Sequence, residues 1–312
     1  MKVSVCITVL NAEGLIGPLL NSLLNQTKNA EEIVIVDGGS TDKTVEIVKH
    51  YQKKNKEIKL LMQKCLRAEG RNLAVEISKN SIIAMTDAGC TAQKDWLEKI
   101  TAPLLHPEVD IVAGVYKMIG DSPKQKALGI FLGFPLSKFG KDFLPTTRSI
   151  AFRKDVWEKV GGFPEGKGNS AEDTEFNYKA VKFGMKYSRV KDAVVEWGIP
   201  QSLNEGLKTM GDYAKWDAHF GIRWHPTQKL TSHNIRVLSI FLRYLLGIVI
   251  VGLGFNNHLF FWLAGLGLLF YVFWAFRKVY LEFNDWSVAL WGPVIQIASD
   301  LVIMKGFLKG IG

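Results

Sequence analysis

Cysteine is scarce in this chain, and its spacing excludes several classes of protein. Only three cysteines occur among the 312 residues, at Cys6, Cys65 and Cys90, an odd and widely separated set without a Cys-x-x-Cys pair. A disulfide framework and a thiolate zinc site are therefore not expected. Because structural disulfides belong mainly to oxidising compartments, a reducing, cytosolic setting is the simpler interpretation.

Long basic runs, a secretory signal and internal repeats are also missing. No run of Lys and Arg exceeds two residues, although 39 basic against 30 acidic residues give a net charge of +9. A positive surface attracts nucleic acid, anionic lipid or phosphorylated small molecules, and the short runs make nucleic acid the least expected of these partners. The segment 2–10 has the pattern of an apolar strand rather than that of a secretory signal. We therefore expect the N-terminal domain to stay in the cytosol.

Short apolar bursts separated by polar turns make up the first part of the chain, a pattern typical of alternating strands and helices. Strands are predicted at 3–9, 33–36, 58–62, 82–85 and 111–115. Apolar residues spaced as on one helix face lie between the first three of these strands, over 15–24 and 45–51. The order predicts an α/β fold with a mostly parallel sheet covered on both faces, and ligands are expected where its strands end.

The character of the sequence changes near residue 231. Three apolar stretches follow, at 235–255, 258–276 and 286–304. The first two reach the length of about 20 residues that crosses a bilayer, so they predict a transmembrane hairpin. We accordingly divide the chain into an α/β domain, 1–231, and a membrane anchor, 232–312, with two or three apolar helices.

The orientation of the hairpin follows from its flanking charges. Arg277 and Lys278 end the second stretch, and cytosolic loops carry an excess of such residues. The third stretch contains Pro293, Gln296 and Asp300, so both a full span and an interfacial helix remain open for it. The alternative of three buried helices in a soluble domain is less consistent with helices that are apolar all round.

Three charged side chains stand where predicted strands end or helices begin. Asp37 starts the glycine turn that follows the second strand, and a carboxylate there can accept a base or ribose hydrogen bond. Arg71 lies at the start of a helix, where a diphosphate is well placed. Asp87 follows the strand 82–85, and an acid there can bind a hard divalent cation on phosphate oxygens. The neighbouring Asp42 is better explained as a helix cap.

The ordered set of these motifs resembles the inverting, GT-A fold glycosyltransferases of family 2. The matching segments are Ile7-Thr8-Val9-Leu10-Asn11-Ala12-Glu13, the Asp-Gly-Gly-Ser-Thr-Asp run from Asp37, the Arg71-Asn72 helix start, the acidic strand end, the segment 150–165 and Ala171-Glu172-Asp173-Thr174-Glu175-Phe176. Each segment is weak alone, and their order carries the resemblance. It covers nearly the whole of the predicted α/β domain.

The resemblance implies a role for particular residues. Thr8, Asn11 and Asp37 would hold the nucleoside of a nucleotide-diphosphate sugar, Arg71 its ribose or diphosphate, and Asp87 the corner where ribose meets a Mn²⁺ or Mg²⁺ ion. Asp173 would be the general base, with Glu172 beside it as the other member of the catalytic pair. A structural role as helix caps is compatible with catalysis for both acids.

Two departures from the family pattern bear on these roles. The metal motif is commonly Asp-x-Asp, whereas Asp87-Ala88-Gly89 supplies one carboxylate, so His219 or His225 is a candidate additional ligand, although a lone histidine is more often structural. The Gln-x-x-Arg-Trp motif of processive members is incomplete, because Phe220 precedes Arg223-Trp224 where Gln is expected. A single transfer per acceptor is the better expectation.

The sequence therefore predicts a membrane glycosyltransferase with its catalytic domain on the cytoplasmic side of the cell membrane. Its acceptor is expected in the bilayer, as a lipid phosphate or a lipid-linked glycan, because anchoring concentrates such acceptors. The basic surface would contact anionic lipid. The alternatives are a catalytically impaired subunit that binds nucleotide sugar, and a transporter, for which the apolar helices offer too few polar groups.

Overall fold

The computed structural model describes residues 1–133, 139–165, 171–222 and 233–312. Its contacts divide the chain into two compact units. The first unit consists of Met1–Lys117 and Pro135–Gly198, and the second of Met118–Phe134 and Ile199–Gly312. The boundary predicted near residue 231 lies outside the described residues, and the division at that point stays a prediction.

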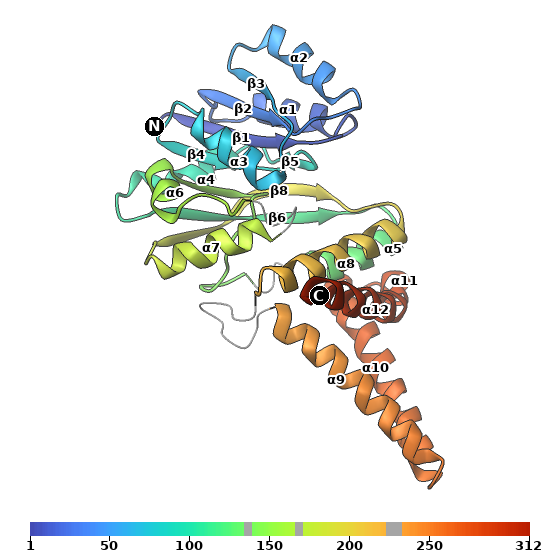
Figure 1. Cartoon of the computed structure of the whole chain (residues 1–312). Coiled ribbons are helices and arrows are strands. Elements are labelled where there is room, and N and C mark those ends of the chain that lie inside the picture. The colour runs from blue at the N-terminus through green and yellow to red at the C-terminus, as the bar shows by residue number, and fades with distance from the viewer. Residues whose placement is uncertain (134–138, 166–170, 223–232) are drawn as a thin grey trace. The chain divides into compact units, whose positions relative to one another are not determined.

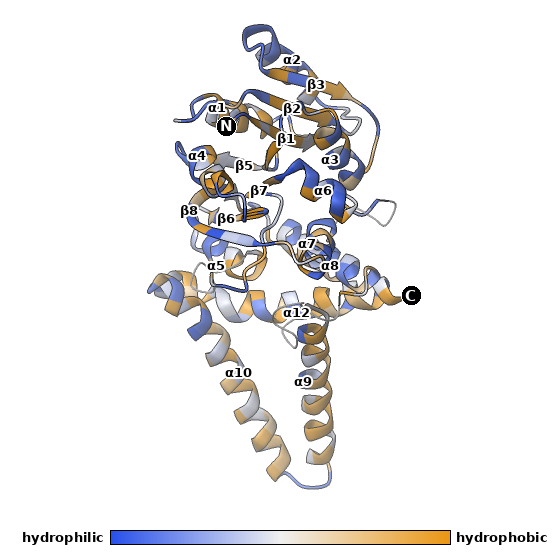
Figure 2. Cartoon of the chain, turned by 90° about the vertical axis from the view of Figure 1, so that its left-hand side faces the viewer, coloured by the Kyte–Doolittle hydropathy of each residue, from blue (hydrophilic) through white to orange (hydrophobic). Residues whose placement is uncertain are grey.

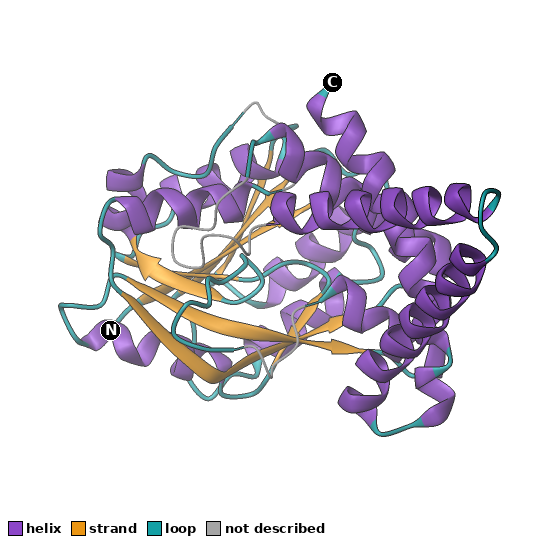
Figure 3. Ribbon diagram, turned by 90° about the horizontal axis from the view of Figure 1, so that it is seen from below, coloured by secondary structure: helices purple, strands orange, loops and turns teal. Residues whose placement is uncertain are grey.

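An eight-stranded sheet forms the centre of the first unit, with the strand order β3-β2-β1-β4-β7-β6-β8-β5 (Figure 1). The strands are β1 Val3–Val9, β2 Glu32–Asp37, β3 Ile58–Met62, β4 Ile82–Met85, β5 Cys90–Ala92, β6 Ile111–Ile119, β7 Ile150–Arg153 and β8 Tyr187–Gly198. β1 pairs in parallel with β2 and β4, and β2 pairs in parallel with β3. β7 is antiparallel to β4 and β6, and β5 is antiparallel to β8. Figure 3 shows the twist of this sheet.

Helices cover both faces of the sheet, as the sequence predicts. They are α1 Ile16–Leu24, α2 Thr44–Lys54, α3 Arg67–Glu76, α4 Trp96–Thr101, the 3₁₀ helix η1 Ala102–Leu105, α6 Lys154–Val160 and α7 Glu172–Lys182. Alternate residues of β1 enter the two cores, with Val5 and Ile7 packed beside α1 and Cys6 packed beside α3. A strand buried on both faces needs an almost continuous apolar run, and this is why β1 was readable from the sequence.

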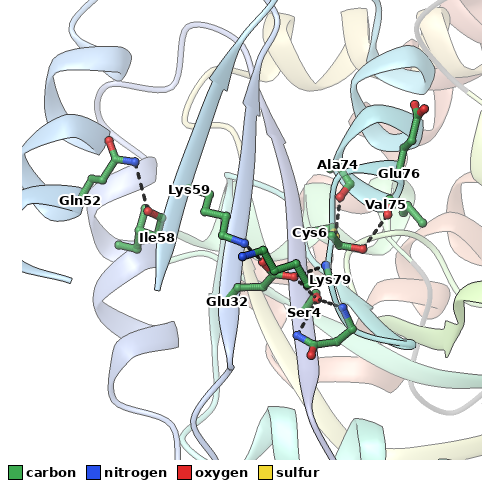
Figure 4. A network of polar contacts seen from close by, with 12 residues as sticks. Ser4, Cys6, Glu32, Gln52, Ile58, Lys59, Ala74, Val75, Glu76 and Lys79 are labelled. Carbon is green, nitrogen blue, oxygen red and sulfur yellow. Dashed lines mark hydrogen bonds and ion pairs between the residues drawn. The ribbon is translucent and has the colours of Figure 1, made fainter. Parts of the chain in front are cut away.

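The amino-terminal edge of the parallel strands is held by a buried acid (Figure 4). Glu32 accepts a 2.7 Å hydrogen bond from Ser4 Oγ, forms an ion pair with Lys59, and accepts a hydrogen bond from the Lys79 backbone N–H. Burial alone would raise the pKa of Glu32, but these partners outweigh it and lower the pKa. The edge opposite this network, where the same strands end, remains available for chemistry.

The second unit is helical. It contains α5 Pro123–Leu132, α8 Leu203–His219, α9 His233–Gly254, α10 Leu259–Phe283, α11 Trp286–Ala289 and α12 Trp291–Ile311. The segments Ile235–Gly254, Leu259–Phe283 and Trp286–Ile311 are long and apolar enough to cross a membrane, and Figure 2 shows the apolar character of α9 and α10. The three apolar segments expected at the C-terminus are therefore confirmed as helices. The third is interrupted after α11 and continues to residue 311.

α12 differs from α9 and α10 because one of its faces is covered. Gly306 and Gly310 pack so closely on the backbone of α8 at Gly211 and Lys215 that neither leaves room for a Cβ atom. The opposite face of α12 exposes large apolar side chains at helical spacing, namely Val294, Ile297, Leu301, Leu308 and Ile311. α12 thus has one face packed on α8 and an opposite face of exposed apolar side chains.

A polar cluster joins α12 to the other two apolar helices. Asp300 on α12 accepts a 2.9 Å hydrogen bond from Arg243 on α9 and another from the Tyr271 hydroxyl on α10. Gln296 donates to the second oxygen of Asp300 at 2.9 Å. Because Asp300 is buried, these partners fix where α9, α10 and α12 meet.

Candidate active site

The turn after β2 is organised by Asp37. Its Oδ2 atom accepts hydrogen bonds from the backbone N–H groups of Gly39, at 3.0 Å, and Ser40, at 2.9 Å. Its Oδ1 atom is buried and has no hydrogen-bond partner among the described residues. One oxygen therefore holds the turn, while the other leaves an acceptor that a ligand donor can satisfy.

Asn11 links the end of β1 to the same turn. Its side-chain oxygen accepts a 2.9 Å hydrogen bond from the Thr41 backbone, and its own N–H donates to Ser40 Oγ at 2.9 Å. Asn11 has a φ of 50°, in the left-handed region that Asn tolerates better than most residues. Asn11 is exposed and stands beside the turn of Asp37.

Thr8 packs against α3 at Gly70. A Cβ atom on Gly70 would lie 3.0 Å from Thr8 Cγ2, so glycine permits this approach without any adjustment of the neighbouring side chains. The next residue on the helix is Arg71, and the close packing brings its side chain to the carboxyl edge of the sheet.

Arg71 is buried and joins two acids from distant parts of the chain. One guanidinium nitrogen donates to Asp87 Oδ1 at 2.9 Å, and the other forms an ion pair with Glu172. Burial alone would lower the pKa of Arg71, but Asp87, Glu172 and Asp173 outweigh it and raise the pKa. The sequence motifs around residues 71, 87 and 172 therefore meet at the guanidinium group of Arg71.

Asp87 stands just beyond the end of β4, and its side chain is 26% exposed. Burial would raise its pKa, but the guanidinium groups of Arg71, Arg148 and Arg67 lower the pKa below the usual range of an aspartate. Asp87 is therefore an anion at neutral pH, with part of its carboxylate open to a ligand.

The two acids at the start of α7 have different environments. Glu172 is buried against Arg71, and its Oε2 atom has no hydrogen-bond partner among the described residues. Asp173 is partly exposed, and its pKa is raised, first by burial and then by the charge of Glu172, while Arg71 and Arg148 oppose the rise. A carboxylate with a raised pKa that solvent can reach is suited to accept a proton.

A family model matches the N-terminal half of the chain. The model of a family described as glycosyl transferase family 2 matches residues 4–161, just over half of the chain. The chain belongs to glycosyl transferase family 2. The match spans Thr8, Asn11, Asp37, Arg71 and Asp87, and it ends before Glu172 and Asp173.

Curated relatives are glycosyltransferases. The glycosyltransferase AglE of Haloferax volcanii is 27% identical over 201 residues, which cover 62% of this chain and 65% of AglE. The poly(ribitol-phosphate) beta-glucosyltransferase of Bacillus spizizenii is 37% identical over 94 residues, covering 28% of this chain and 15% of that enzyme. The chain thus spans less than two thirds of the length of these relatives.

Solved structures show the same fold. The mannosyltransferase PcManGT from Pyrobaculum calidifontis, in complex with GDP-Man and Mn²⁺, has a TM-score of 0.62 at 19% identity and covers 99% of this chain and 87% of its own. S. aureus TarS 1-349 in complex with UDP has a TM-score of 0.53 at 20% identity, covering 98% and 89%. The GT-A type fold predicted from the sequence, with its parallel strands and C-terminal apolar helices, is confirmed.

A cation site of this glycosyltransferase would be incomplete without its donor. Among the described residues, no three His, Cys, Asp or Glu side chains gather closely enough to hold a metal ion. Asp87 supplies one carboxylate, which fits the way Mg²⁺ binds one or two acids together with substrate phosphates and water. His219 ends α8 in the second unit and His225 lies outside the described residues, so a role for either in cation binding stays a prediction.

Sequence reasoning missed two side chains beside the acids. Arg148 precedes β7, and its guanidinium carbon lies 3.8 Å from the centre of the Trp197 ring. Neither residue stands in a motif or directly after a predicted strand, so only the fold reveals their position. Arg223 and Trp224, which the comparison with processive members used, lie outside the described residues.

Proposed function

We propose that this family 2 glycosyltransferase moves a sugar from a nucleotide-diphosphate donor to an acceptor at the membrane, with inversion at the anomeric carbon. The observation that carries the proposal is the bridge from Arg71 to both Asp87 and Glu172, which joins the strand-end acid to the Glu172-Asp173 pair. The printed ligands of the two solved neighbours, GDP-Man with Mn²⁺ and UDP, support the donor class.

The nucleoside is proposed to bind beside the turn that Asp37 organises. The unpartnered Asp37 Oδ1 can accept a hydrogen bond from the base or ribose, and this bond relieves the cost of a buried oxygen without a partner. Asn11 and Thr8 line the same side of the site in this proposal, since both lie at the end of β1.

The leaving diphosphate is proposed to face Arg71 and Asp87. Negative charge builds on it as the glycosidic bond breaks, and fixed positive groups stabilise that charge. Arg71 is held in place by its two acids, so little reorganisation accompanies the step. A divalent cation bound to Asp87 and the diphosphate would add Lewis-acid stabilisation of the leaving group.

Asp173 is proposed as the general base. The acceptor hydroxyl attacks the anomeric carbon from the face opposite the leaving group, and Asp173 takes its proton, which gives inversion in one step. Glu172 keeps Arg71 oriented through their ion pair. If the acceptor is a lipid phosphate it is already anionic, and Asp173 then positions it rather than deprotonates it.

A screen of donors and acceptors tests the proposal. The purified full chain is incubated with UDP- and GDP-linked sugars, with and without a polyprenyl or dolichyl phosphate in detergent micelles. Product with a lipid acceptor, carrying the inverted anomeric configuration by NMR, is expected. Tight nucleotide-sugar binding without hydrolysis or transfer to any acceptor would instead favour the impaired binding subunit, which the single acid of Asp87-Ala88-Gly89 makes the alternative.

Cation binding is expected to depend on the nucleotide. Because Asp87 alone is too few ligands, Mn²⁺ should bind weakly to the protein and far more tightly when UDP or GDP is present, and the coupling must be reciprocal. Titration of Mn²⁺ followed by electron paramagnetic resonance measures this directly, and Asp87→Asn should remove the coupling. Transfer should fall in EDTA and return with Mn²⁺ or Mg²⁺. Undiminished transfer in chelator would contradict the proposed role of a divalent cation.

The cytoplasmic location of the catalytic domain is also proposed, with α9 and α10 as a membrane hairpin and α12 in the interface. α8, whose exposed residues include Glu205, Lys208 and Asp212, packs along α12, and a helix with these charges is poorly suited to hydrocarbon. The apolar face of α12 opposite α8 suits the boundary between headgroups and acyl chains.

This topology predicts that both ends of the hairpin lie on one side of the membrane. An epitope tag after Gly312 should show the same protease sensitivity in sealed vesicles as the catalytic domain, and a tag between Asn256 and Asn257 should not. The full chain should also remain in the membrane fraction after a high-salt wash. Opposite protection of the Gly312 tag and the catalytic domain would mean that α12 crosses the bilayer.

A further inference from the structure

A side chain at position 89, two residues after Asp87, would be in tight contact with Trp197. A Cβ atom on Gly89 would lie 3.2 Å from Trp197 Nε1 and 3.4 Å from Trp197 Cδ1. The indole is held there because β5 begins at Cys90, whose antiparallel partner on β8 is Trp197 itself. The indole of Trp197 therefore stands where a side chain at position 89 would project, and a second acid there would require the indole to shift by a few tenths of an ångström.

The ring of Trp197 is in turn stacked with the guanidinium group of Arg148. The Arg148 guanidinium carbon lies 3.8 Å from the centre of the Trp197 ring and 5.0 Å from that of Tyr116. The two rings meet edge to face, with centres 5.8 Å apart, on the neighbouring strands β8 and β6. Such stacking is stronger for arginine than a contact with a flexible ammonium group, because the planar guanidinium is already rigid.

The backbone beside Arg148 is fixed as well. Ser149 is buried, accepts a 2.9 Å hydrogen bond from Trp96 Nε1, and donates to the Ala193 carbonyl at 3.1 Å. Thr147, on the other side, is also buried. Arg148 is thus anchored at its backbone and at its guanidinium.

The charge of Arg148 acts on the acids of the site. It lowers the pKa of Asp87 and opposes the rise in the pKa of Asp173. The cluster of acids is Asp87, Glu172 and Asp173, and the arginines whose charge reaches one or more of them are Arg67, Arg71 and Arg148. These formal charges cancel, so the site offers a free cation little attraction before a diphosphate arrives.

We propose that Arg148 binds the diphosphate of the donor and carries part of the positive charge that a cation held by two acids would otherwise supply. This inference rests on the proposed function. A guanidinium can bind two phosphate oxygens at once, and one stacked on an indole loses little freedom on doing so. Nucleotide binding should consequently survive in part when the divalent cation is removed.

Calorimetric titration with UDP and with GDP, each in Mn²⁺ and in EDTA, tests the inference on the full chain in detergent. Wild type should keep measurable affinity for one of the two nucleotides in EDTA. Arg148→Ala should bind that nucleotide about 10- to 100-fold more weakly in EDTA, and Mn²⁺ should increase its affinity by a larger factor than for wild type. Arg148→Lys, which retains charge without the planar fork, should fall between the two.

Arg189 provides a matched control, because its guanidinium also stacks on an aromatic ring of the first unit, 5.5 Å from the centre of Tyr187. Arg189→Lys should leave both affinities within about twofold of wild type, an effect smaller than one hydrogen bond. If Arg148→Ala does not give a cooperative melt, the affinity of Arg148→Lys for the nucleotide in EDTA is compared with that of wild type instead. Equal affinities of wild type and a folded Arg148 variant in EDTA would overturn the inference alone. Failure of wild type to bind UDP or GDP under any condition would overturn the proposed donor class and the inference with it.

Discussion

Asp173→Asn is expected to reduce sugar transfer to a hydroxyl acceptor by about 10² to 10⁴-fold, the usual contribution of a general base. Asparagine has nearly the same size and still accepts hydrogen bonds, but it does not take up a proton at neutral pH. The affinity for the donor nucleotide should change little, since Asp37 and Arg71 carry the proposed nucleotide contacts. Initial transfer rates and calorimetric binding are measured together.

The pH dependence provides a second measurement of the same residue. The pKa of Asp173 is raised, so this side chain loses its proton at a higher pH than an ordinary aspartate does. The wild-type transfer rate should rise with pH as Asp173 becomes deprotonated. A carboxyl group whose pKa is raised in the folded state lowers stability progressively as the pH rises from the unfolded-state pKa to the folded-state pKa, and the full loss is present at higher pH. Asp173→Asn should therefore leave the melting temperature at neutral pH unchanged or higher.

Glu175→Gln is a suitable control for Asp173→Asn. Both acids lie in the first turn of α7, so both variants remove one carboxylate from the same helix N-terminus. Only Asp173→Asn should reduce transfer by the factor given above. Loss of both rate and nucleotide binding would indicate a structural role for Asp173, and a near-normal rate would point to Glu172 or to a phosphate acceptor.

Arg71→Met should be the most destabilising substitution in the site. It leaves Glu172 buried without its cation, and breaking one partner of a buried pair typically costs about 3–5 kcal/mol of unfolding free energy. In a domain of this size the melting temperature should fall by roughly 6 to 20 °C. Nucleotide binding should be lost in the fraction that remains folded.

A double variant separates charge from packing. Arg71→Met combined with Glu172→Gln removes the unpaired charge, so it should be more stable than Arg71→Met alone. Lys59→Met serves as the control, because Lys59 pairs with the buried Glu32 at the opposite edge of the strands and should affect stability without affecting nucleotide binding. A double variant less stable than Arg71→Met would contradict the ion-pair account.

The difference in stability between wild type and Arg71→Met should become smaller at low pH. Arg71 and its neighbours lower the pKa of Asp87, so the contribution of Asp87 to stability is present above its unfolded pKa of about 3.9 and is lost as the pH falls through the lower folded value. Wild type and Arg71→Met should therefore approach each other in stability at low pH.

The sequence was most informative where strands are buried on both faces. The predicted strands 3–9 and 82–85 coincide with β1 and β4, which are buried along almost their whole length because central parallel strands need continuous apolar runs. The predicted strand 58–62 coincides with the edge strand β3, most of which is only partly buried. β8 was not predicted, since only Ala193 and Val195 along it are fully buried and the charged residues Lys191, Asp192 and Glu196 flank them. Its pairing with β5 depends on the tertiary fold rather than on a local pattern.

The same contrast applies to the site. Asp37 and Asp87 were recognisable because acids at strand ends meet at one edge of a parallel sheet. The ion pair between Arg71 and Glu172 joins residues far apart in sequence, and nothing in either motif specifies it. Their roles in catalysis stay predictions, to be decided by the variants described above.

The packing of α8 against α12 affects how a water-soluble form of the enzyme could be made. A chain shortened near residue 231 would keep α5 and α8 but lose α11 and α12. Leu128 and Met210, which are buried in one cluster with Val288 and Ile295, would then face water. Such a fragment would lose the membrane anchor but expose a new apolar patch that promotes aggregation. Polar substitutions on α5 and α8 would therefore have to accompany the truncation.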